Sequence, residues 1–590
     1  MKESYMKKTK IVCTIGPASE SEETLRALMA TGMNVCRLNF SHGDHVEHLE
    51  RINKIKKIRK EVGDHIAIML DLKGPEIRIG KFEQEPIQLA PGDKFTLTTR
   101  DIIGNKEIVS VSYVGLPNDL SIGSRILIDD GLVEFIVEDI VDGTDIVTKV
   151  VNYGELKQRK GVNVPNVKIN LPSLTQKDID DIKFGIENEV DFIAASFVRS
   201  SQDVLNIKKV LEENGGEQIK IISKIENEEG VENLDDIIEI SDGIMVARGD
   251  LGVEVSNERV PLVQKEIIRK TNFAGKPVIT ATQMLDSMIR NPRPTRAEVN
   301  DVANAILDGS DAIMLSGETA AGKYPIESVS QMVKIAENIE GSIDFKKAME
   351  IRNSWTEDDS TNVIAMSVCQ ISERLNANGI VAATTTGTTA RSISKFRPFT
   401  TIVAATYDEK VARSLALVWG VYSVITKRVE HTDELIDTSI YSALRGGLIF
   451  EGELIVLTAG IPAGIGGTTN LIKVHTVGKI LLQGQAIGKG SVVGRVCKGE
   501  SAKQLKEKFM DGDILVAKYT DADIVEYIER ASGIIVSEGG LTSHGAIAAI
   551  HYKKPAIIGV NYEMADIKDG QIITLDAISG IVYDGVAKVI

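Results

Sequence analysis

Eight short and almost uninterrupted apolar runs, each followed by a longer polar or helical segment, constrain the fold of this chain most. They cover residues 10–16, 33–40, 67–72, 192–197, 220–226, 243–250, 277–283 and 312–319. Parallel strands that are buried on both faces have nearly continuous apolar sequences. Eight such strands alternating with helices make a (β/α)8 barrel. We therefore predict an α/β chain built on that barrel.

The segments between the runs fit the helices of such a barrel. Residues 21–32, SEETLRALMATG, carry apolar residues at helical spacing and end in glycine, a common helix stop. This segment is predicted to be the first helix.

Three other segments depart from the barrel pattern. The gap between the third and fourth runs is too long for one crossover and contains short alternating strands such as KFTLTT, which predicts an inserted small β-barrel domain acting as a lid. Further on, strand runs such as TIVAAT alternate with helical segments, and a Gly- and Val-rich unit follows. The predicted domains are the barrel (1–72 and 171–340), the lid (73–170), an α/β effector domain with an open, mostly parallel sheet (341–476) and an extra α/β tail (477–590).

Composition excludes several classes of protein. The net charge of −16 disfavours binding to a phosphate backbone, so we expect no nucleic-acid partner. The four cysteines lie far apart without CxxC spacing, which suits a reduced cytoplasm better than a disulfide framework or a zinc site. No signal peptide and no membrane span are expected.

Polar side chains gather where the predicted strands end. The carboxyl ends of barrel strands meet at one mouth, where the reacting groups of such enzymes lie. One polar strand end is usually only the point where a strand meets solvent, but six that converge on one mouth indicate a site. These ends carry Arg37, Asn39, Ser41, Asp71, Lys73, Lys224, Glu226, Arg248, Asp250, Thr280, Thr282, Ser316 and Glu318.

Two carboxylates on neighbouring strands suggest a divalent metal. Mg²⁺ takes one or two protein carboxylates and completes its octahedron with substrate oxygens and water, which Glu226 and Asp250 would allow. The alternative is that each carboxylate forms a structural ion pair with Lys224 or Arg248. Gly249 would let backbone amides approach an anionic carboxylate or phosphate.

The remaining polar groups suggest a monovalent cation and an anionic substrate. Asn39, Ser41 and Asp71 offer neutral and singly charged oxygens that suit a weakly held cation. With the cations Arg37, Arg78 and Lys224 nearby, the mouth suits phosphoryl transfer, which needs positioning and charge neutralisation. Neither a Walker A motif nor a protein-kinase catalytic loop is present.

Nine motifs in order closely resemble the pyruvate kinase family, over roughly residues 8 to 475. They are CTIGPAS (13–19), RLNFSHG (37–43), DLKGPEIR (71–78), KGVNVP (160–165), SKIEN (223–227), ARGDLG (247–252), TATQMLDSM (280–288), RPTRAEVNDVANAI (293–306) and LSGET (315–319). The resemblance implies transfer of phosphate from phosphoenolpyruvate to ADP, giving pyruvate and ATP, in the last step of glycolysis. It also implies a homotetramer.

The resemblance assigns roles to the matching positions. Lys224 would neutralise the moving phosphoryl group, Arg37 would grip the phosphate, and Glu226 and Asp250 would hold Mg²⁺ or Mn²⁺. The amides of Gly249 and Asp250, with Thr282, would hold the substrate carboxylate, and Thr282 would lie near the face where the enolate is protonated. The K⁺ ligands would be Asn39, Ser41, Asp71 and the Leu72 carbonyl, and the nucleotide side would hold Asn39, His42, Arg78 and Lys160.

Two positions refine the predicted K⁺ site. Leu72 stands where the family often has threonine, but a backbone carbonyl ligand would be preserved. Glu76 resembles the K⁺-dependent branch of the family, whereas the K⁺-independent branch carries lysine at this position. The ammonium group of a lysine there could replace the charge of the cation. We therefore expect activation by K⁺.

The stretch TTTGTTARSISKF (384–396) is predicted to be a strand, a hydroxyl-rich loop and a helix. A simple N-cap turn would explain it, but the resemblance places the phosphate of an effector there. The second predicted effector loop, 459–470, departs from the Trp-containing version found in some family members that fructose 1,6-bisphosphate regulates. Ribose 5-phosphate or AMP is therefore as plausible an effector as fructose 1,6-bisphosphate. The predicted effector residues are Thr384, Thr385, Thr386, Thr388 and Thr389.

The tail motif SEGGLTSHGAIAAI (537–550) resembles the mobile phosphohistidine domain of phosphoenolpyruvate-utilising enzymes. The histidine that matches His544 carries phosphate in those enzymes, but this chain shows no nucleotide-grasp module to load it. A structural or interface role for His544 is therefore favoured.

Two competing interpretations remain. The first is another barrel enzyme with a lysine and a metal, such as an aldolase or a phosphoenolpyruvate mutase. A Schiff-base lysine would need a lowered pKa, whereas Glu226 beside Lys224 favours the charged form. The second is an inactive binding or regulatory protein, which the full set of metal, cation and phosphate residues disfavours.

Overall fold

The computed structural model describes residues 6–62, 65–354, 359–429, 431–460, 469–561 and 567–589. The chain divides into two compact units. One comprises Met1–Thr356, Ser394–Arg397 and Asp408–Ser423, and the other Glu357–Ile393, Pro398–Tyr407 and Val424–Ile590.

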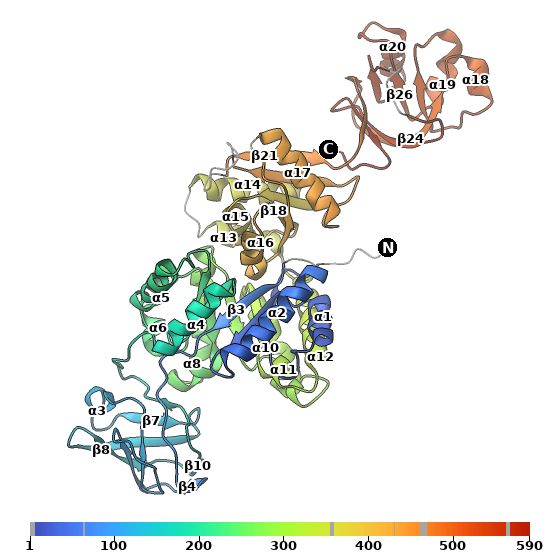
Figure 1. The fold of residues 1–590 in the computed structure, drawn as a ribbon. Coiled ribbons are helices and arrows are strands. Elements are labelled where there is room, and N and C mark those ends of the chain that lie inside the picture. The colour runs from blue at the N-terminus through green and yellow to red at the C-terminus, as the bar shows by residue number, and fades with distance from the viewer. Residues whose placement is uncertain are drawn as a thin grey trace. The chain divides into compact units, whose positions relative to one another are not determined.

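The first unit contains a closed barrel of eight parallel strands, as predicted (Figure 1). Neighbouring strands follow the order β1-β16-β15-β14-β13-β12-β3-β2. The strands are β1 (Lys10–Thr14), β2 (Val35–Asn39), β3 (Ala67–Asp71), β12 (Phe192–Ala195), β13 (Lys220–Ile225), β14 (Gly243–Ala247), β15 (Val278–Ala281) and β16 (Ala312–Leu315).

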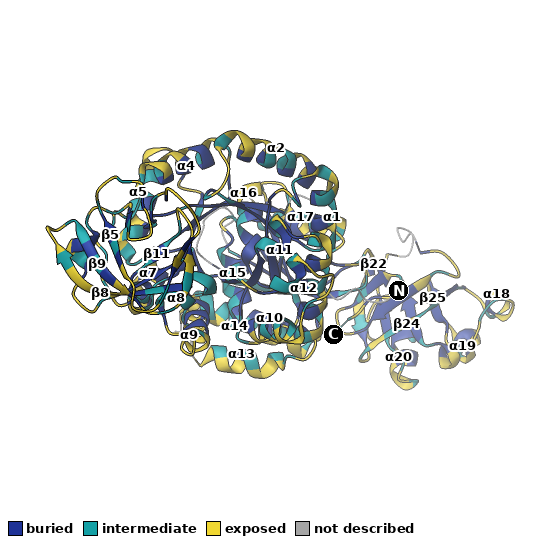
Figure 2. Ribbon diagram, turned by 90° about the horizontal axis from the view of Figure 1, so that it is seen from below, coloured by how far each residue is buried: buried dark blue, intermediate teal, exposed yellow. Residues whose placement is uncertain are grey.

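Helices surround the barrel strands, which form a buried centre (Figure 2). The first helix, α1 (Glu22–Thr31), confirms the prediction: the Ser21 hydroxyl accepts a hydrogen bond from the Thr24 amide, and Gly32 ends the helix at φ +131°. The others are α2 (His45–Val62), α4 (Gln176–Glu187), α5 (Ser201–Glu213), α6 (Glu228–Glu232), α7 (Leu234–Ile240), α8 (Arg248–Glu254), α9 (Val260–Phe273), α10 (Arg296–Leu307), α11 (Gly317–Ala320) and α12 (Pro325–Glu340).

Strand periodicity decides which residues reach the barrel interior. Val35, Met69, Phe192 and Ile222 pack together inside the barrel, whereas their immediate neighbours pack in the layer beneath the helices. Arg37, Asp71, Ser196 and Lys224 each lie two or four residues beyond one of these inner residues. They therefore extend the inner face into the mouth.

The insertion between β3 and α4 is a small β domain with its own core around Phe95 and Phe135. Its six-stranded sheet has the order β11-β7-β8-β9-β5-β6, and β10 pairs with β4. These strands are β4 (Ile87–Leu89), β5 (Lys94–Thr98), β6 (Ile108–Ser110), β7 (Arg125–Ile128), β8 (Val133–Val141), β9 (Asp145–Val150), β10 (Gly154–Leu156) and β11 (Val162–Asn163).

A five-stranded sheet of order β19-β18-β17-β20-β21 follows the barrel in sequence. β17 pairs in parallel with both β18 and β20, and β21 is antiparallel. The strands are β17 (Gly379–Ala383), β18 (Thr401–Thr406), β19 (Val421–Ile425), β20 (Leu454–Ala459) and β21 (Leu471–Thr476). The helices are α13 (Phe345–Asn353), α14 (Ser360–Arg374), α15 (Thr388–Lys395), α16 (Glu409–Ser414) and α17 (Thr432–Arg445).

The tail forms an eight-stranded mixed sheet of order β22-β29-β28-β24-β25-β26-β27-β23. Its strands are β22 (Ile480–Gln483), β23 (Gln485–Ile487), β24 (Ser491–Lys498), β25 (Ile514–Ala517), β26 (Gly533–Val536), β27 (Ala556–Ile558), β28 (Ile572–Asp576) and β29 (Ile581–Asp584). Its helices are α18 (Ala502–Lys506), α19 (Val525–Arg530) and α20 (His544–His551).

The end of the tail contacts the segment that carries the five-stranded sheet. The Lys588 amide donates to the Gly452 carbonyl, and the Gly452 amide donates to the Val477 carbonyl, both at 2.6 Å. Gly452 has φ +89°, and a Cβ there would lie 2.1 Å from the Val586 carbonyl oxygen. Glycine at this position therefore permits the close approach.

No helix among the described residues is long and apolar enough to cross a membrane.

Candidate active site

Four buried charged side chains meet at the barrel mouth. Lys224 Nζ lies 2.8 Å from Glu226 Oε1 and 3.4 Å from Asp71 Oδ1, and Arg37 Nε lies 2.6 Å from Asp71 Oδ2. Burial alone would lower the pKa of Lys224, but the Asp71 and Glu226 carboxylates outweigh it and raise the pKa above the usual value of a lysine. The two carboxylates therefore favour the charged form of Lys224, whereas a Schiff-base lysine needs the neutral form.

Ser196 and Phe197 belong to this network, although the sequence did not single them out. Lys224 Nζ donates to the Ser196 hydroxyl at 2.7 Å, and that hydroxyl donates to the Leu72 carbonyl at 2.8 Å. The Phe197 amide donates to Glu226 Oε2 at 2.6 Å. Both residues end the run FIAASF, and only its strand period could have pointed to Ser196 as a mouth residue.

Glu226 and Asp250 lie close enough for their charges to interact; Glu226 is buried and Asp250 is half-buried. Burial raises the pKa of Glu226 to about 7, with Lys224 opposing the rise and Asp250 adding to it. Burial also raises the pKa of Asp250. Two neighbouring carboxyl groups at this largely buried position would suit a divalent cation.

The described residues contain no group of three or more His, Cys, Asp or Glu side chains that could hold a metal. Glu226 and Asp250 would therefore be the only carboxylates of such a site here, and other oxygens must complete the coordination. This small number of protein ligands is what Mg²⁺ bound together with a substrate requires.

The predicted K⁺ ligands lie on the adjacent strands β2 and β3. Asn39 and Asp71 are register partners, and the Asn39 side-chain oxygen accepts the Ser41 amide at 3.1 Å. The Leu72 carbonyl lies next to Asp71 and accepts the Ser196 hydroxyl. The structure thus brings these oxygens to one side of the mouth.

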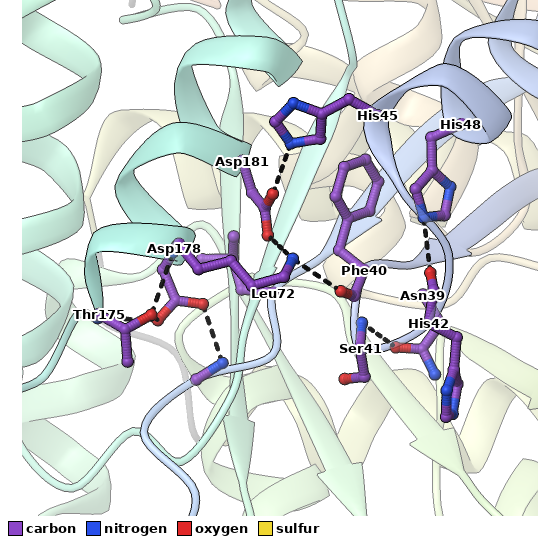
Figure 3. A network of polar contacts seen from close by, with 12 residues as sticks. Asn39, Phe40, Ser41, His42, His45, His48, Leu72, Thr175, Asp178 and Asp181 are labelled. Atoms are coloured by element: carbon purple, nitrogen blue, oxygen red, sulfur yellow. Dashed lines mark hydrogen bonds and ion pairs between the residues drawn. The ribbon is translucent and has the colours of Figure 1, made fainter.

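Helix α4 holds the loop that carries Asn39, Ser41 and His42 (Figure 3). Lys177 Nζ donates to the Phe40 carbonyl at 3.0 Å and pairs with Asp181 at 2.6 Å. Asp181 is buried and also contacts His45 Nε2 at 2.7 Å.

The same helix anchors the start of the lid. Gly74, at φ +71°, donates its amide to Asp178 Oδ1 at 3.0 Å, while the Asp178 carboxylate also caps α4 at Thr175 (Figure 3). On the returning chain, Arg199 donates to the carbonyls of Ile169 and Leu171, both at 2.6 Å.

Hydrogen bonds around Thr282 link the residues that follow β14 to those that follow β15. The Thr282 hydroxyl accepts the Gly249 amide at 2.7 Å, and Arg248 Nη2 donates to the Thr282 carbonyl, also at 2.7 Å. Arg248 pairs with Asp301 rather than with a mouth carboxylate, which excludes the pairing of Asp250 with Arg248 that the sequence left open.

Two other polar strand ends do not reach the mouth chemistry. Thr280 is fully buried and hydrogen-bonds to Ser310 at 2.7 Å, in the layer beneath the helices. Glu318 accepts the amides of Leu285 and Ser316, at 3.0 and 2.8 Å, and is a structural brace. The polar residues at these two strand ends therefore have structural roles and do not belong to the site.

Two of the predicted nucleotide residues lie side by side: Arg78 forms an isolated β-bridge with Gly161, and the Ile79 amide donates to the Lys160 carbonyl at 3.0 Å. Arg78 pairs with Glu76 at 2.8 Å and donates to the Arg159 carbonyl, and Lys160 pairs with Asp129 at 2.8 Å. The His42 side chain is exposed at the tip of its loop. Between lid and barrel lies a cavity of about 720 Å³, lined by Asp130, Gly249 and Asp250 among others.

The hydroxyl-rich loop before α15 is partly a turn. Thr384 accepts the Gly387 amide at 2.9 Å, and the Thr386 and Thr388 hydroxyls bond to each other at 2.9 Å. Thr389 bonds to Thr469 at 2.9 Å, which brings the second predicted loop close. Residues 461–468 of that second loop lie outside the described residues.

In the tail, His544 is the first residue of α20. Its Nδ1 lies 2.9 Å from the Thr520 hydroxyl, and Ser543 caps the helix. The four cysteines are all free and buried.

A parallel (β/α)8 barrel whose mouth combines a lysine, an arginine and buried carboxylates has the kind of site with which enzymes of this fold handle anionic substrates. Three family models match the chain: "Pyruvate kinase, barrel domain" over residues 6–329, "Pyruvate kinase, alpha/beta domain" over 362–475, and "PEP-utilising enzyme, mobile domain" over 509–580.

Similar proteins agree with these matches. Pyruvate kinases of Bacillus licheniformis and Geobacillus stearothermophilus are 52% and 51% identical to this chain, over 99% of it and 100% of each relative. A crystal structure of a pyruvate kinase from Cryptosporidium parvum has a TM-score of 0.76 at 43% identity and covers 80% of this chain and 96% of that chain. The chain belongs to the pyruvate kinase family, and the family's phosphoryl-transfer reaction is the activity that this relationship supports. The resemblance predicted from the sequence is confirmed.

Proposed function

We propose that the barrel mouth transfers the phosphoryl group of phosphoenolpyruvate to ADP with the residues predicted above. The observation that supports this most is the position of Lys224, which pairs with Glu226 at 2.8 Å while Glu226 faces Asp250. Glu226 and Asp250 would hold Mg²⁺ or Mn²⁺, which would supply neutralisation of charge on the substrate oxygens. Arg37 grips the phosphate, and Lys224 offsets the charge of the phosphoryl group as it moves.

The carboxylate of the substrate lies against the start of α8. The Gly249 amide, which donates to Thr282 Oγ1 in this structure, then donates to the carboxylate instead, together with the Asp250 amide. Breaking the phosphate ester leaves an enolate, and its methylene carbon takes a proton, directly or through water, on the face near Thr282. The nucleotide lies on the side of Asn39, His42, Arg78 and Lys160.

K⁺ is the proposed second cofactor, held by Asn39, Ser41, Asp71 and the Leu72 carbonyl. Support comes from the acidic Glu76, which pairs with Arg78 and leaves no lysine ammonium at that position. Equal activity in Na⁺ and in K⁺, with Mg²⁺ present, would contradict this part of the proposal.

Regulation is proposed at the loop of Thr384, Thr385, Thr386, Thr388 and Thr389, which binds the phosphate of a sugar phosphate or of AMP. The hydroxyls and the start of α15 support it. The proposal also includes a homotetramer, a cytoplasmic location and the domain limits 1–72 with 171–340, 73–170, 341–476 and 477–590.

A coupled assay of ATP formation from phosphoenolpyruvate and ADP tests the proposal. It is run with Mg²⁺, with and without K⁺, and with ribose 5-phosphate, AMP or fructose 1,6-bisphosphate added. ATP formation that K⁺ increases supports the mouth chemistry, and activation by one of the three phosphates supports the effector site. Trapping of pyruvate by borohydride on Lys224 would instead favour an aldolase-type enzyme.

A further inference from the structure

Arg248, the residue that follows β14, makes three contacts, two of them at the carboxyl end of β15. Its Nε donates to the Ala281 carbonyl at 3.1 Å, its Nη2 to the Thr282 carbonyl at 2.7 Å, and its Nη1 pairs with Asp301 Oδ1 at 2.6 Å. The side chain is only 13% exposed. A guanidinium with this fork of donors fixes two consecutive carbonyls at once.

The carbonyls that Arg248 holds belong to a backbone that L-residues rarely adopt. Thr282 has φ +69° and Gln283 has φ +53°. A β-branched residue in this region is an outlier that persists only where the surroundings impose it.

The unusual backbone changes the direction of one side chain. In a regular strand, Thr282 would share the face of Thr280, which points into the layer beneath the helices and bonds to Ser310. The left-handed turn instead brings the Thr282 hydroxyl to 2.7 Å from the Gly249 amide, whose hydrogen bond it accepts, while it donates to the Ala281 carbonyl at 2.7 Å. The turn therefore places this hydroxyl beside Gly249, where the proposed function puts the substrate carboxylate.

We propose that Arg248 is a positioning residue for the known reaction: it holds the strained turn at Thr282 and Gln283 so that the Thr282 hydroxyl faces the mouth. Asp301, on α10, orients the guanidinium. This inference rests on the role of Thr282 under the proposed function. Arg248 acts through this turn, because its hydrogen bonds go to Ala281, Thr282 and Asp301.

Loss of Arg248 should affect protonation of the enolate more than phosphoryl transfer. Without Arg248 the turn relaxes, and the Thr282 hydroxyl leaves the face where the enolate carbon gains its proton. In the reverse sense, pyruvate loses a methyl proton to solvent and becomes the enolate, a step measurable without phosphoryl transfer. Displacing a group by about 1 Å can slow such a step by about 100-fold.

The test compares Arg248→Ala with Thr282→Ala and with the full chain. Two rates are measured: ATP formation from phosphoenolpyruvate and ADP, and exchange of the pyruvate methyl protons with deuterated water in the presence of Mg²⁺, K⁺ and ATP. We expect Arg248→Ala to reduce exchange by about 100-fold, and to reduce it more than ATP formation, as Thr282→Ala does. Added methylguanidinium should restore part of the exchange rate.

Controls separate positioning from charge and from folding. Arg259→Ala removes a cation from the same cavity, where Arg259 pairs with Glu228 at 3.0 Å without touching the turn, and should leave the ratio of the two rates unchanged. Mn²⁺ binding, read by electron paramagnetic resonance, should be retained in Arg248→Ala. If that variant does not fold, Asp301→Asn should shift the ratio in the same direction by a smaller factor.

Three results would overturn the inference. One is an unchanged ratio of exchange to ATP formation in Arg248→Ala, or in Asp301→Asn if the first does not fold. The second is loss of Mn²⁺ binding together with both rates, which would show a structural role only, and the third is an equal effect of Arg259→Ala. Lack of ATP formation by the full chain would instead refute the proposed function, and a normal ratio in Thr282→Ala would refute the role of Thr282.

Discussion

Arg37, Asp71, Lys224 and Glu226 hold one another in place at the barrel mouth, because each is buried against an opposite charge. Burial would raise the pKa of Asp71, yet Arg37 and Lys224 together lower it below its usual value. Removing one partner of such a set leaves the others buried without compensation. At the residue scale, the mouth is thus a network of ion pairs. An anionic substrate or a cation can enter it by replacing one member of such a pair as the partner of the other.

A buried lysine at the opposite end of the barrel gives a prediction for pH. Burial lowers the pKa of Lys7 from 10.5 to about 8, although Glu340, Cys13 and Glu337 oppose it. Between about pH 8 and 10.5 the unfolded chain keeps this proton and the folded chain releases it, so the contribution of Lys7 to stability rises with pH in that window. Below it, the full penalty for burying the charge remains.

The variant Lys7→Met removes this titration. The difference in free energy of unfolding between variant and wild type should move by about 2 kcal/mol in favour of the wild type from pH 7 to 9.5, since one pKa unit corresponds to about 1.4 kcal/mol. Urea unfolding at the two pH values measures it. Lys183→Met, on the exposed face of α4, is the control, and a difference that does not change with pH for Lys7→Met would contradict the prediction.

The sequence predicts which strand residues face the mouth only where the two-residue period of the strand continues. Lys224 and Glu226 share the inner face as their two-residue spacing predicts, and both lie in the charged network. Ser196 has the same register but follows an apolar run, so no polar signal marked it. Thr282 breaks the period through its left-handed backbone, which no local residue preference announces.

At the scale of elements, α4 contacts two segments that are far apart in the sequence. Lys177 near its start holds the Phe40 carbonyl, while Asp178 holds the Gly74 amide at the entrance to the lid (Figure 3). The loop with the predicted K⁺ ligands and the start of the inserted β domain therefore share one supporting helix. The barrel and its helices were predictable from hydrophobic period, but this connection depends on tertiary contacts between distant segments.

Replacing Lys177 tests that support. Lys177→Met removes the hydrogen bond to the Phe40 carbonyl, so the loop of Asn39 and Ser41 loses one of its restraints. The K⁺ concentration for half-maximal activation should rise by several-fold, consistent with about 1 kcal/mol for one hydrogen bond, while kcat at saturating K⁺ changes less. A K⁺ titration of ATP formation measures this. Lys183→Met on the same helix should have no effect, and an unchanged K⁺ requirement in Lys177→Met would contradict the argument.

At the scale of the whole molecule, the active-site residues all belong to the first unit, whereas the tail belongs to the second. The tail contacts the segment of the five-stranded sheet through Lys588, whose carbonyl accepts the Thr476 hydroxyl at 2.9 Å and whose amide donates to the Gly452 carbonyl. The tail sheet was predicted only as an α/β unit, because its eight strands combine segments from both ends of the tail.

A chain that ends at residue 476 should keep the barrel chemistry and lose stability elsewhere. It retains every predicted mouth residue but loses the bonds of Gly452 and Thr476 to the tail, each worth about 1 kcal/mol. We expect ATP formation at the wild-type kcat with a lower thermal midpoint by differential scanning fluorimetry. Gly452→Ala in the full chain, where a Cβ would meet the Val586 carbonyl at 2.1 Å, should lower the midpoint in the same direction. Loss of activity on truncation would contradict this division of labour.

The central claim is that Lys224 serves the moving phosphoryl group while Glu226 serves the metal. The decisive measurement is Mn²⁺ binding and ATP formation in Lys224→Met and Glu226→Ala, with Lys220→Met, which pairs with Asp242 at the other end of β13, as the control. Lys224→Met should reduce kcat by at least about 1,000-fold and still bind Mn²⁺, because Glu226 and Asp250 remain, whereas Glu226→Ala should weaken Mn²⁺ binding first. ATP formation at a near-normal rate in Lys224→Met would contradict the account.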